Sequence, residues 1–241
     1  MYETILSPVD YGGLRLKNRI LFAPTTFGLS DEETLAKYRA LAEGGCAMII
    51  VGDVPVGKSR FEKSLFDAKG FAFYQQLAEI AHAADCKLCA QLHQTDTDMM
   101  SIIKCIPGML MKKITPDQLR ERMNDAVGPY ITKMSQKKIH QIIAGFGKAA
   151  VLAKQAGFDM VQVHGDRMCG SFSSALFNHR TDEYGAAPAL PWKLSRQCTP
   201  LCPAWPLTTS WLSGRRTPIT ATPVWWRRNW PCSCPCWCRQ A

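Results

Sequence analysis

Acidic residues are missing from the last 56 residues of this 241-residue chain. Residues 1–185 hold all 20 Asp and Glu together with 22 Lys and Arg, whereas residues 186–241 hold 7 Lys and Arg. The formal net charge of +9 therefore divides into a nearly neutral body and a basic tail. Because ordinary globular chains mix charges of both signs, we take the basic balance as a property of the tail. It does not predict a nucleic-acid-binding protein.

The chain also lacks a long apolar run. No segment approaches the roughly 20 apolar residues of a membrane helix, and the Met-Tyr-Glu-Thr start lacks the basic and apolar regions of a signal peptide. The body has an odd number of cysteines, which favours reduced thiols over a disulfide framework. We therefore expect a cytoplasmic protein with no membrane partner.

Four short apolar segments in the body predict strands that are covered on both faces, as in a parallel sheet. They are Arg19–Ala23, Ala47–Gly52, Lys87–Leu92 and Phe158–Val163. Helical patterns lie between them, so the strands and helices alternate. This order predicts an α/β fold with right-handed crossovers.

Capping residues and the spacing of apolar residues predict three helices in the body. Ser30 and Glu33 form a capping-box pattern that predicts a helix to about Glu43. A second helix is expected from about Phe71 to Ala84. The third has the clearest helical spacing, and its apolar positions are Ile139, Ile142, Ile143, Phe146, Ala149, Ala150 and Ala153.

Residues 93–138 break the alternation. This segment is long for a connection, which indicates a lid, a binding loop or disorder. Within it, Thr115 and Pro116 form an N-cap and N1 pair that predicts a short helix to about Asn124.

Cys86 and Cys89 form a C-x-x-C pattern, which is found in redox and metal sites. Cys89 lies inside the apolar run of the third predicted strand, however. We therefore favour two buried thiols.

Four blocks of the body resemble a known family, the FMN-dependent Old Yellow Enzymes, in the NADH:flavin oxidoreductase / 2-enoate reductase branch. The blocks are LSPVDYGGLRLKNRILFAPTT, GGCAMIIVGDVPVG, KLCAQLHQ and AGFDMVQVHG with LFNHRTDEYG. The resemblance covers residues 5–185, and the last block is the most specific of the four.

The resemblance implies a TIM (β/α)8-barrel fold. Only about the first four βα units are recognisable, so we expect a truncated barrel followed by an aberrant, unstructured tail. It further implies FMN as cofactor, NADH or NADPH as reductant, and a small unsaturated carbonyl compound, an enone or enoate, as substrate. The family binds the FMN phosphate at its seventh and eighth strands, which are not recognisable here.

Two catalytic residues follow from the resemblance. His164 ends the fourth predicted strand, where the family's histidine hydrogen-bonds the substrate oxygen. Arg167 stands where the family has a second His or Asn, and its charged fork suits an anionic group. The family's tyrosine proton donor is missing, and Met168 and Cys169 occupy that stretch. Without the resemblance, a structural histidine and a small buried cysteine are the alternatives.

The resemblance assigns five residues to the flavin. Gln91 would pair with the ring, and Gly52 would let the backbone approach it closely. The turn of Ala23, Pro24 and Thr25 would contact it through the backbone. Taken alone, these residues are equally consistent with an ordinary loop glutamine and a strand-ending turn.

Residues 186–241 are rich in Trp, Cys and Pro and have no helical or strand period. A Leu- and Val-rich coding segment read one base out of frame yields Trp and Cys codons. A suitable shifted reading of residues 205–241 gives a plausible βα unit. We therefore divide the chain into a half-barrel at 1–185 and a tail at 186–241, and we attribute the tail to a one-base change near codon 186. The rival is a genuine Arg- and Trp-rich tail that binds membranes or nucleic acid.

Two functions remain open at this stage. In the first, the chain reduces an activated C=C bond with hydride from NAD(P)H through FMN. In the second, it is a non-catalytic fragment that cannot hold FMN.

Overall fold

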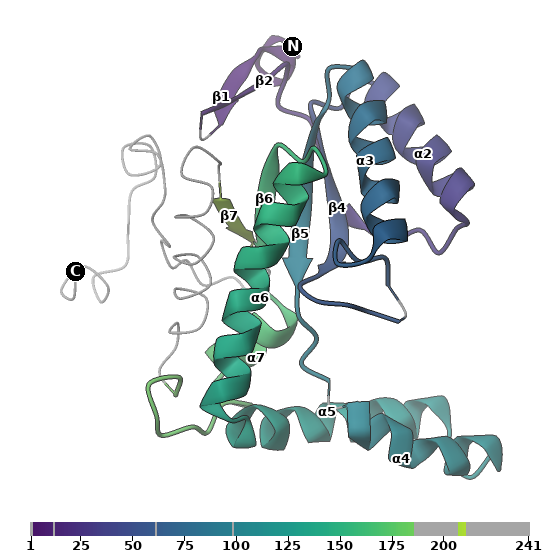
Figure 1. The fold of residues 1–241 in the computed structure, drawn as a ribbon, viewed down its shortest axis with the longest axis vertical. Coiled ribbons are helices and arrows are strands. Elements are labelled where there is room, and N and C mark those ends of the chain that lie inside the picture. Colours follow the sequence, from purple (N-terminus) through teal and green to yellow (C-terminus); the bar gives the residue numbers. More distant parts are fainter. Residues whose placement is uncertain (1, 12, 61, 98, 186–206, 211–241) are drawn as a thin grey trace.

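The computed structural model describes residues 2–11, 13–60, 62–97, 99–185 and 207–210 (Figure 1). Its centre is a five-stranded parallel sheet in the order β3-β4-β5-β6-β7. The strands are β3 (Leu21–Thr25), β4 (Met48–Pro55), β5 (Lys87–His93), β6 (Met160–His164) and β7 (Leu207–Ser210). Each of the first four is followed by a helix, which confirms the predicted βα order and the α/β class.

Three long helices cover the sheet: α2 (Asp31–Glu43), α3 (Ala68–Ala83) and α6 (Gln136–Gln155). Helices α2 and α3 pack against each other, and α6 packs on β5 and β6 (Figure 1). The predicted capping box is present, because the Ser30 hydroxyl accepts from the Glu33 backbone N–H and Glu33 reaches back to Ser30. Helix α3 begins three residues earlier than predicted because Asp67 caps it.

Residues 93–138 form a pair of helices and not an extended loop. The pair consists of α4 (Met99–Leu110) and α5 (Pro116–Lys133), which pack against each other. Thr115 caps α5 as predicted, but α5 runs nine residues beyond the predicted end. Pro107 lies inside α4 and Pro129 inside α5. Proline is disfavoured in helix interiors, so the local helix propensity argued against α4 and against the second half of α5. The packing of the two helices against each other stabilises both.

A β-hairpin that the sequence did not reveal precedes the sheet. Strands β1 (Val9–Tyr11) and β2 (Leu14–Leu16) pair antiparallel after the short helix α1 (Glu3–Leu6). Leu16 is buried in a small cluster at the start of the central strands, and its partners are Ala47, Met48, Cys89 and Met160. The hairpin therefore covers the amino-terminal end of the sheet, opposite the end where parallel strands place their reactive groups.

The expectation of an unstructured tail does not hold for Leu207–Ser210. These residues form β7, which pairs parallel with β6 from Val161 to His164. Without this segment, β6 would be an edge strand with unpaired N–H and C=O groups. Leu207–Ser210 pairs with those groups, and its two threonines favour an extended strand. The other residues of the 186–241 segment lie outside the described residues, so the domain boundary and the reading-frame hypothesis stay predictions.

The cysteines of the C-x-x-C pattern are free and fully buried. Burial raises the pKa of the Cys86 thiol to about 12 and that of Cys89 further. Both thiols therefore stay protonated at neutral pH, as the buried-thiol interpretation requires. Among the described residues, no group of three or more His, Cys, Asp or Glu side chains is arranged to hold a metal ion.

None of the described helices is both long enough and apolar enough to cross a membrane.

Candidate functional site

The carboxyl ends of β3, β4, β5 and β6 surround a cavity of about 390 Å³. Six of the seven predicted site residues line it: Pro24, Thr25, Gly52, Gln91, His164 and Arg167. Ala23, the seventh, lies one residue earlier in β3 and does not line the cavity. The structure therefore brings together residues that are up to 143 positions apart in sequence.

Gln91 is held by a partner that the sequence did not single out. The Gln91 Nε2 donates to Gln162 Oε1 at 2.7 Å, and both side chains are buried. The two residues lie opposite each other in the register of β5 and β6. Gln162 precedes His164 by two positions, so strand alternation places it on the same face. That alternation in VQVH was the signal that could have found it.

His164 ends β6 with one ring nitrogen unused. Its Nδ1 is buried and has no hydrogen-bond partner among the described residues. Burial lowers the pKa of His164, and the charges of Asp166 and Asp53 oppose that shift only in part. The imidazole is therefore neutral at pH 7, with one N–H to donate and one nitrogen to accept.

Two residues of the cavity hold left-handed backbone conformations that side chains other than glycine rarely adopt. Asp53 has φ 53° and Arg167 has φ 54°. Such conformations are strained and cluster at functional sites. Asp53 and Asp166 also line the cavity, and no sequence pattern singled out either residue. Together with Arg167, these two aspartates give the cavity charges of both signs.

Gly52 is required by a close approach of two strands. A Cβ atom at this position would lie 3.3 Å from both Pro24 Cβ and the Thr25 backbone nitrogen. The register of β3 and β4 is irregular between Phe22 and Thr25. The absence of a side chain at Gly52 thus allows the β3 turn to pack beside β4 at the edge of the cavity.

The RTDEYG segment proves to be a structural clamp. Arg180 Nη1 donates to the carbonyl oxygens of Ile131, Thr132 and Met134, at 3.0, 3.2 and 2.6 Å. Its Nε donates to Asp182 at 2.9 Å, and this bond is the main reason that the pKa of Asp182 falls to about 2. The segment therefore ties the chain after β6 to the end of α5.

Asn178 completes the clamp. Its Nδ2 donates to the carbonyl oxygens of Phe172 and Tyr184, at 2.6 and 2.7 Å. Phe172 belongs to α7 (Arg167–Ser173), the short helix that begins with the catalytic candidate Arg167. The motif thus fixes the position of α7 beside the cavity. Cys169 is buried in α7, which agrees with the structural alternative for that thiol.

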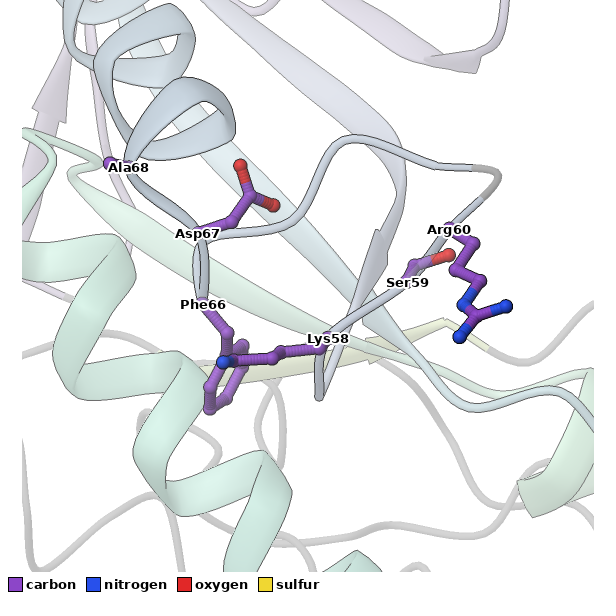
Figure 2. A pocket seen from close by; sticks show the side chains of 6 residues that line it. All are labelled: Lys58, Ser59, Arg60, Phe66, Asp67 and Ala68. Atoms are coloured by element: carbon purple, nitrogen blue, oxygen red, sulfur yellow. The ribbon is translucent and has the colours of Figure 1, made fainter.

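A second hollow, of about 630 Å³, lies in the loop between β4 and α3 (Figure 2). Its lining includes the exposed cations Lys58 and Arg60, and Asp67, which caps α3 through a 2.7 Å hydrogen bond from the Gly70 N–H. None of the predicted site residues lies there. The cavity at the strand ends, although smaller, is therefore the candidate site.

A parallel βα sheet with a polar cavity at the carboxyl ends of its strands places the chain in the α/β class, to which α/β barrels and doubly wound sheets both belong. Residues 4–188 match the NADH:flavin oxidoreductase / NADH oxidase family. This chain belongs to that family, which confirms the resemblance. The cofactor of the family is FMN, and its reductant is NAD(P)H.

The relatives and the solved structures agree with this assignment. The chain is 57% identical over 199 residues to the bilirubin reductase of Clostridium symbiosum, covering 82% of this chain and 53% of that protein. It is 26% identical over 206 residues to the cinnamate reductase of Clostridium sporogenes, covering 77% and 30%. The Old Yellow Enzyme of Pichia superposes with a TM-score of 0.69 at 20% identity, covering 86% and 58%.

The last comparison confirms the TIM-barrel fold for the part of the barrel that is present. The chain spans about half the length of the first of these curated relatives and less than a third of the second.

The residues of the cavity fit a flavin ring. Gly52 leaves the space that a Cβ would fill, and the His164 Nδ1 has no partner among the described residues. Gln91 offers a buried amide whose oxygen has no donor among the hydrogen bonds of the described residues. A planar group with several acceptors and an N–H donor suits this set.

Proposed function

We propose that this chain forms the substrate-side half of an FMN-dependent reductase that reduces a C=C bond conjugated to a carbonyl group with hydride from NAD(P)H. The observation that carries the proposal is the convergence of Pro24, Gly52, Gln91 and His164 on one cavity. These residues come from four neighbouring parallel strands, whose carboxyl ends meet at one edge of the sheet.

The residues take the following roles in the proposal. Gln91 orients the flavin ring, and its bond to Gln162 keeps the amide from rotating. The turn from Ala23 to Thr25 and the bare backbone at Gly52, which lie close together, would contact the flavin ring. Bound flavin supplies hydride to the substrate.

His164 and Arg167 act on the substrate oxygen. The neutral His164 donates an N–H to the carbonyl oxygen, which withdraws electrons from the C=C bond and stabilises the charge that develops on the oxygen. Arg167 adds a second, permanently charged donor. The substitution of Arg for the family's usual residue distinguishes this site from that of simple enone reductases.

The first substrates to compare are bilirubin and cinnamate, after the names of two relatives. Both contain conjugated C=C bonds, but bilirubin also carries pyrrole-type N–H groups. The higher identity to bilirubin reductases, 57% and 33% for two of them, makes bilirubin the substrate that we propose.

Purification of the full chain under anaerobic conditions, followed by addition of FMN, NADH and each substrate, tests the proposal. His164→Ala should slow substrate reduction by about 10²–10³-fold, as loss of an oxyanion donor does. Arg167→Lys keeps the positive charge and loses the forked pair of N–H donors of the guanidinium. The matched control is Arg120→Lys, because Arg120 is exposed on α5. Unchanged turnover in the His164 variant would contradict the assignment.

The second candidate function is that of a non-catalytic fragment. The family match ends at residue 188, close to the proposed boundary at 185, although the chain continues to residue 241. A barrel without its phosphate site loses charge-assisted contacts that contribute about 1.5–3 kcal/mol each.

Comparison of FMN with riboflavin separates the two candidates. A chain with a phosphate site binds FMN far more tightly than riboflavin. A fragment binds both weakly and equally. The nucleotide sequence around codon 186 tests the reading-frame hypothesis independently, because stop codons throughout the shifted frame would exclude it.

A further inference from the structure

The hollow between β4 and α3 is larger than the candidate site, and the proposed reaction leaves it unused. It has a volume of about 630 Å³ and lies in the loop that follows the carboxyl end of β4 (Figure 2). In α/β barrels, the loops at this end of the strands build the active site. A part of the substrate that extends beyond the reacting bond would therefore meet this loop.

Hydrogen bonds within the loop and to α3 hold the hollow in one shape. The Ser64 Oγ donates to the Gly57 carbonyl oxygen at 2.7 Å and accepts from the Phe66 N–H at 3.1 Å. The Tyr74 hydroxyl of α3 donates to the Lys63 carbonyl oxygen at 3.0 Å. A ligand that binds to a preformed hollow avoids the entropic cost of ordering a loop.

Two cations that line the hollow, Lys58 and Arg60, have no counter-ion among the described residues. Both residues are exposed, and the ion pairs of the described part of the chain involve neither of them. The carboxylate in the lining, Asp67, accepts from the Gly70 N–H at the start of α3, where the helix dipole stabilises a negative charge. The hollow therefore has an excess of positive charge, which suits an anionic ligand.

The loop lies at the same edge of the sheet as the candidate site. Its Glu62 Oε1 lies 3.4 Å from the Nε2 of His93, a buried residue that ends β5. Strand β5 is adjacent to β6, which ends at His164. Asp53, which lines the candidate site, precedes Lys58 by five residues, and five residues span at most about 17 Å. An elongated ligand of that length therefore reaches from the candidate site to the hollow.

We propose that Lys58 and Arg60 bind the two carboxylate groups of a linear tetrapyrrole such as bilirubin, while the C=C bond to be reduced lies at His164. This inference rests on the proposed function. Bilirubin carries two propionate side chains, and carboxyl groups are ionised at neutral pH. The side chains of Lys58 and Arg60 point in different directions (Figure 2), which suits two separate carboxylates and not one. Cinnamate has a single carboxylate beside its C=C bond, so it cannot occupy the candidate site and the hollow together.

Equilibrium dialysis of bilirubin and of bilirubin dimethyl ester against the full chain tests the site, with FMN present and NADH absent so that no turnover occurs. The variant Lys58→Gln/Arg60→Gln removes both charges and keeps polar side chains. It should raise the Kd of bilirubin by about tenfold, the effect of two exposed ion pairs, and leave the Kd of the ester unchanged. The matched control, Lys112→Gln/Lys113→Gln, removes two charges at exposed positions after α4 and should change neither Kd.

Three results of the dialysis would overturn the carboxylate site. The first is equal affinity for bilirubin in the wild type and in the Lys58→Gln/Arg60→Gln variant. The second is an equal loss of affinity for bilirubin and for its ester, which would mean that the variant disturbs the loop and not a charge contact. The third is a wild-type chain that binds neither ligand. Because Lys58 and Arg60 are exposed, we expect the variant to keep the fold.

Turnover separates this inference from the proposed function. With FMN and NADH, the double variant should raise the KM for bilirubin about tenfold at unchanged kcat, because contacts away from the reacting bond are the same in the ground state and the transition state. A fall in kcat at unchanged KM would overturn the assignment. A wild-type chain that binds bilirubin with the expected charge dependence but reduces no substrate would refute the proposed function and leave the carboxylate site in place.

Discussion

The central sheet and helix α4 are both rich in apolar residues, but they bury them differently. Strands β4, β5 and β6 lie between helices on one side and the polar cavity and hairpin on the other, and most of their residues are buried. Helix α4 leaves several large apolar side chains exposed, among them Ile103, Ile106, Met109 and Leu110. Helices α4 and α5 lie to one side of the sheet in Figure 1.

The difference explains where the chemistry lies. A side chain is positioned within fractions of an ångström only where its neighbours are packed on all sides. Gln91, which is buried and hydrogen-bonded to Gln162, meets this condition in the sheet. The α4–α5 pair lies outside it, and none of its described residues lines the cavity. Its role in the site is indirect, through the carbonyl groups that Arg180 binds.

The largest effect is expected from Leu77→Ala. Leu77 lies in α3 and is 0% exposed in the main core, so its truncation leaves a cavity between helix and sheet. The free energy of unfolding should fall by about 3–4 kcal/mol. Urea denaturation measures it, and a loss below 1 kcal/mol would contradict the description of this core as closely packed.

Arg180→Ala should have the next largest effect, about 2–3 kcal/mol, because it leaves three carbonyl groups and Asp182 without a charged donor. It also frees α7, so His164 and Arg167 should lose their relative positions. Thermal unfolding and limited proteolysis after residue 165 measure both effects. Arg120→Ala, on the exposed face of α5, serves as the control and should change neither.

Acid should weaken the same clamp. The pKa of Asp182 is about 2 in the folded chain against an ordinary value of 3.8. The stabilisation is therefore complete above about pH 4 and is lost as the pH falls toward 2. Because the side chain is 27% exposed, we expect about 1–2 kcal/mol. In urea titrations, Asp182→Asn should be less stable than the wild type at pH 5, and the gap should close near pH 2.

The smallest effect is expected from Leu110→Ala, the same substitution as in α3 at a position that is 79% exposed. The free energy of unfolding should change by less than about 0.5 kcal/mol. A loss comparable to that of Leu77→Ala would mean that α4 is covered in solution, and the contrast between the two regions would no longer hold.

The fold was predictable where the local pattern and the packing agree. The strands from Arg19–Ala23 to Phe158–Val163 were found within three residues of the observed ends because each is a continuous apolar run, although β3 is half-buried on one face and exposed on the other. The capping box at Ser30 located the start of α2. Helix α4 was missed because Pro107 and Gly108 argue against a helix locally, and β7 because its pairing depends on the edge of β6.

The site was predictable only through family resemblance, which supplied Gln91 and His164. Asp53 and His93 were missed since no local pattern distinguishes them from ordinary polar residues, and Gln162 was missed although the alternation in VQVH places it on the face of His164. Their importance depends on strand register and burial. Gln162 becomes significant because it lies opposite Gln91, and His93 because both of its ring nitrogens are buried.

The order of residues along the chain was enough to determine the alternation of strands and helices, the family, and the uneven distribution of charge. Hydrophobic periodicity and capping are local, so these properties follow from neighbouring residues. Only the tertiary structure decided that RTDEYG clamps α7 to α5 and that two histidines end adjacent strands. Those facts depend on groups that lie tens of residues apart in sequence, and packing alone brings them together.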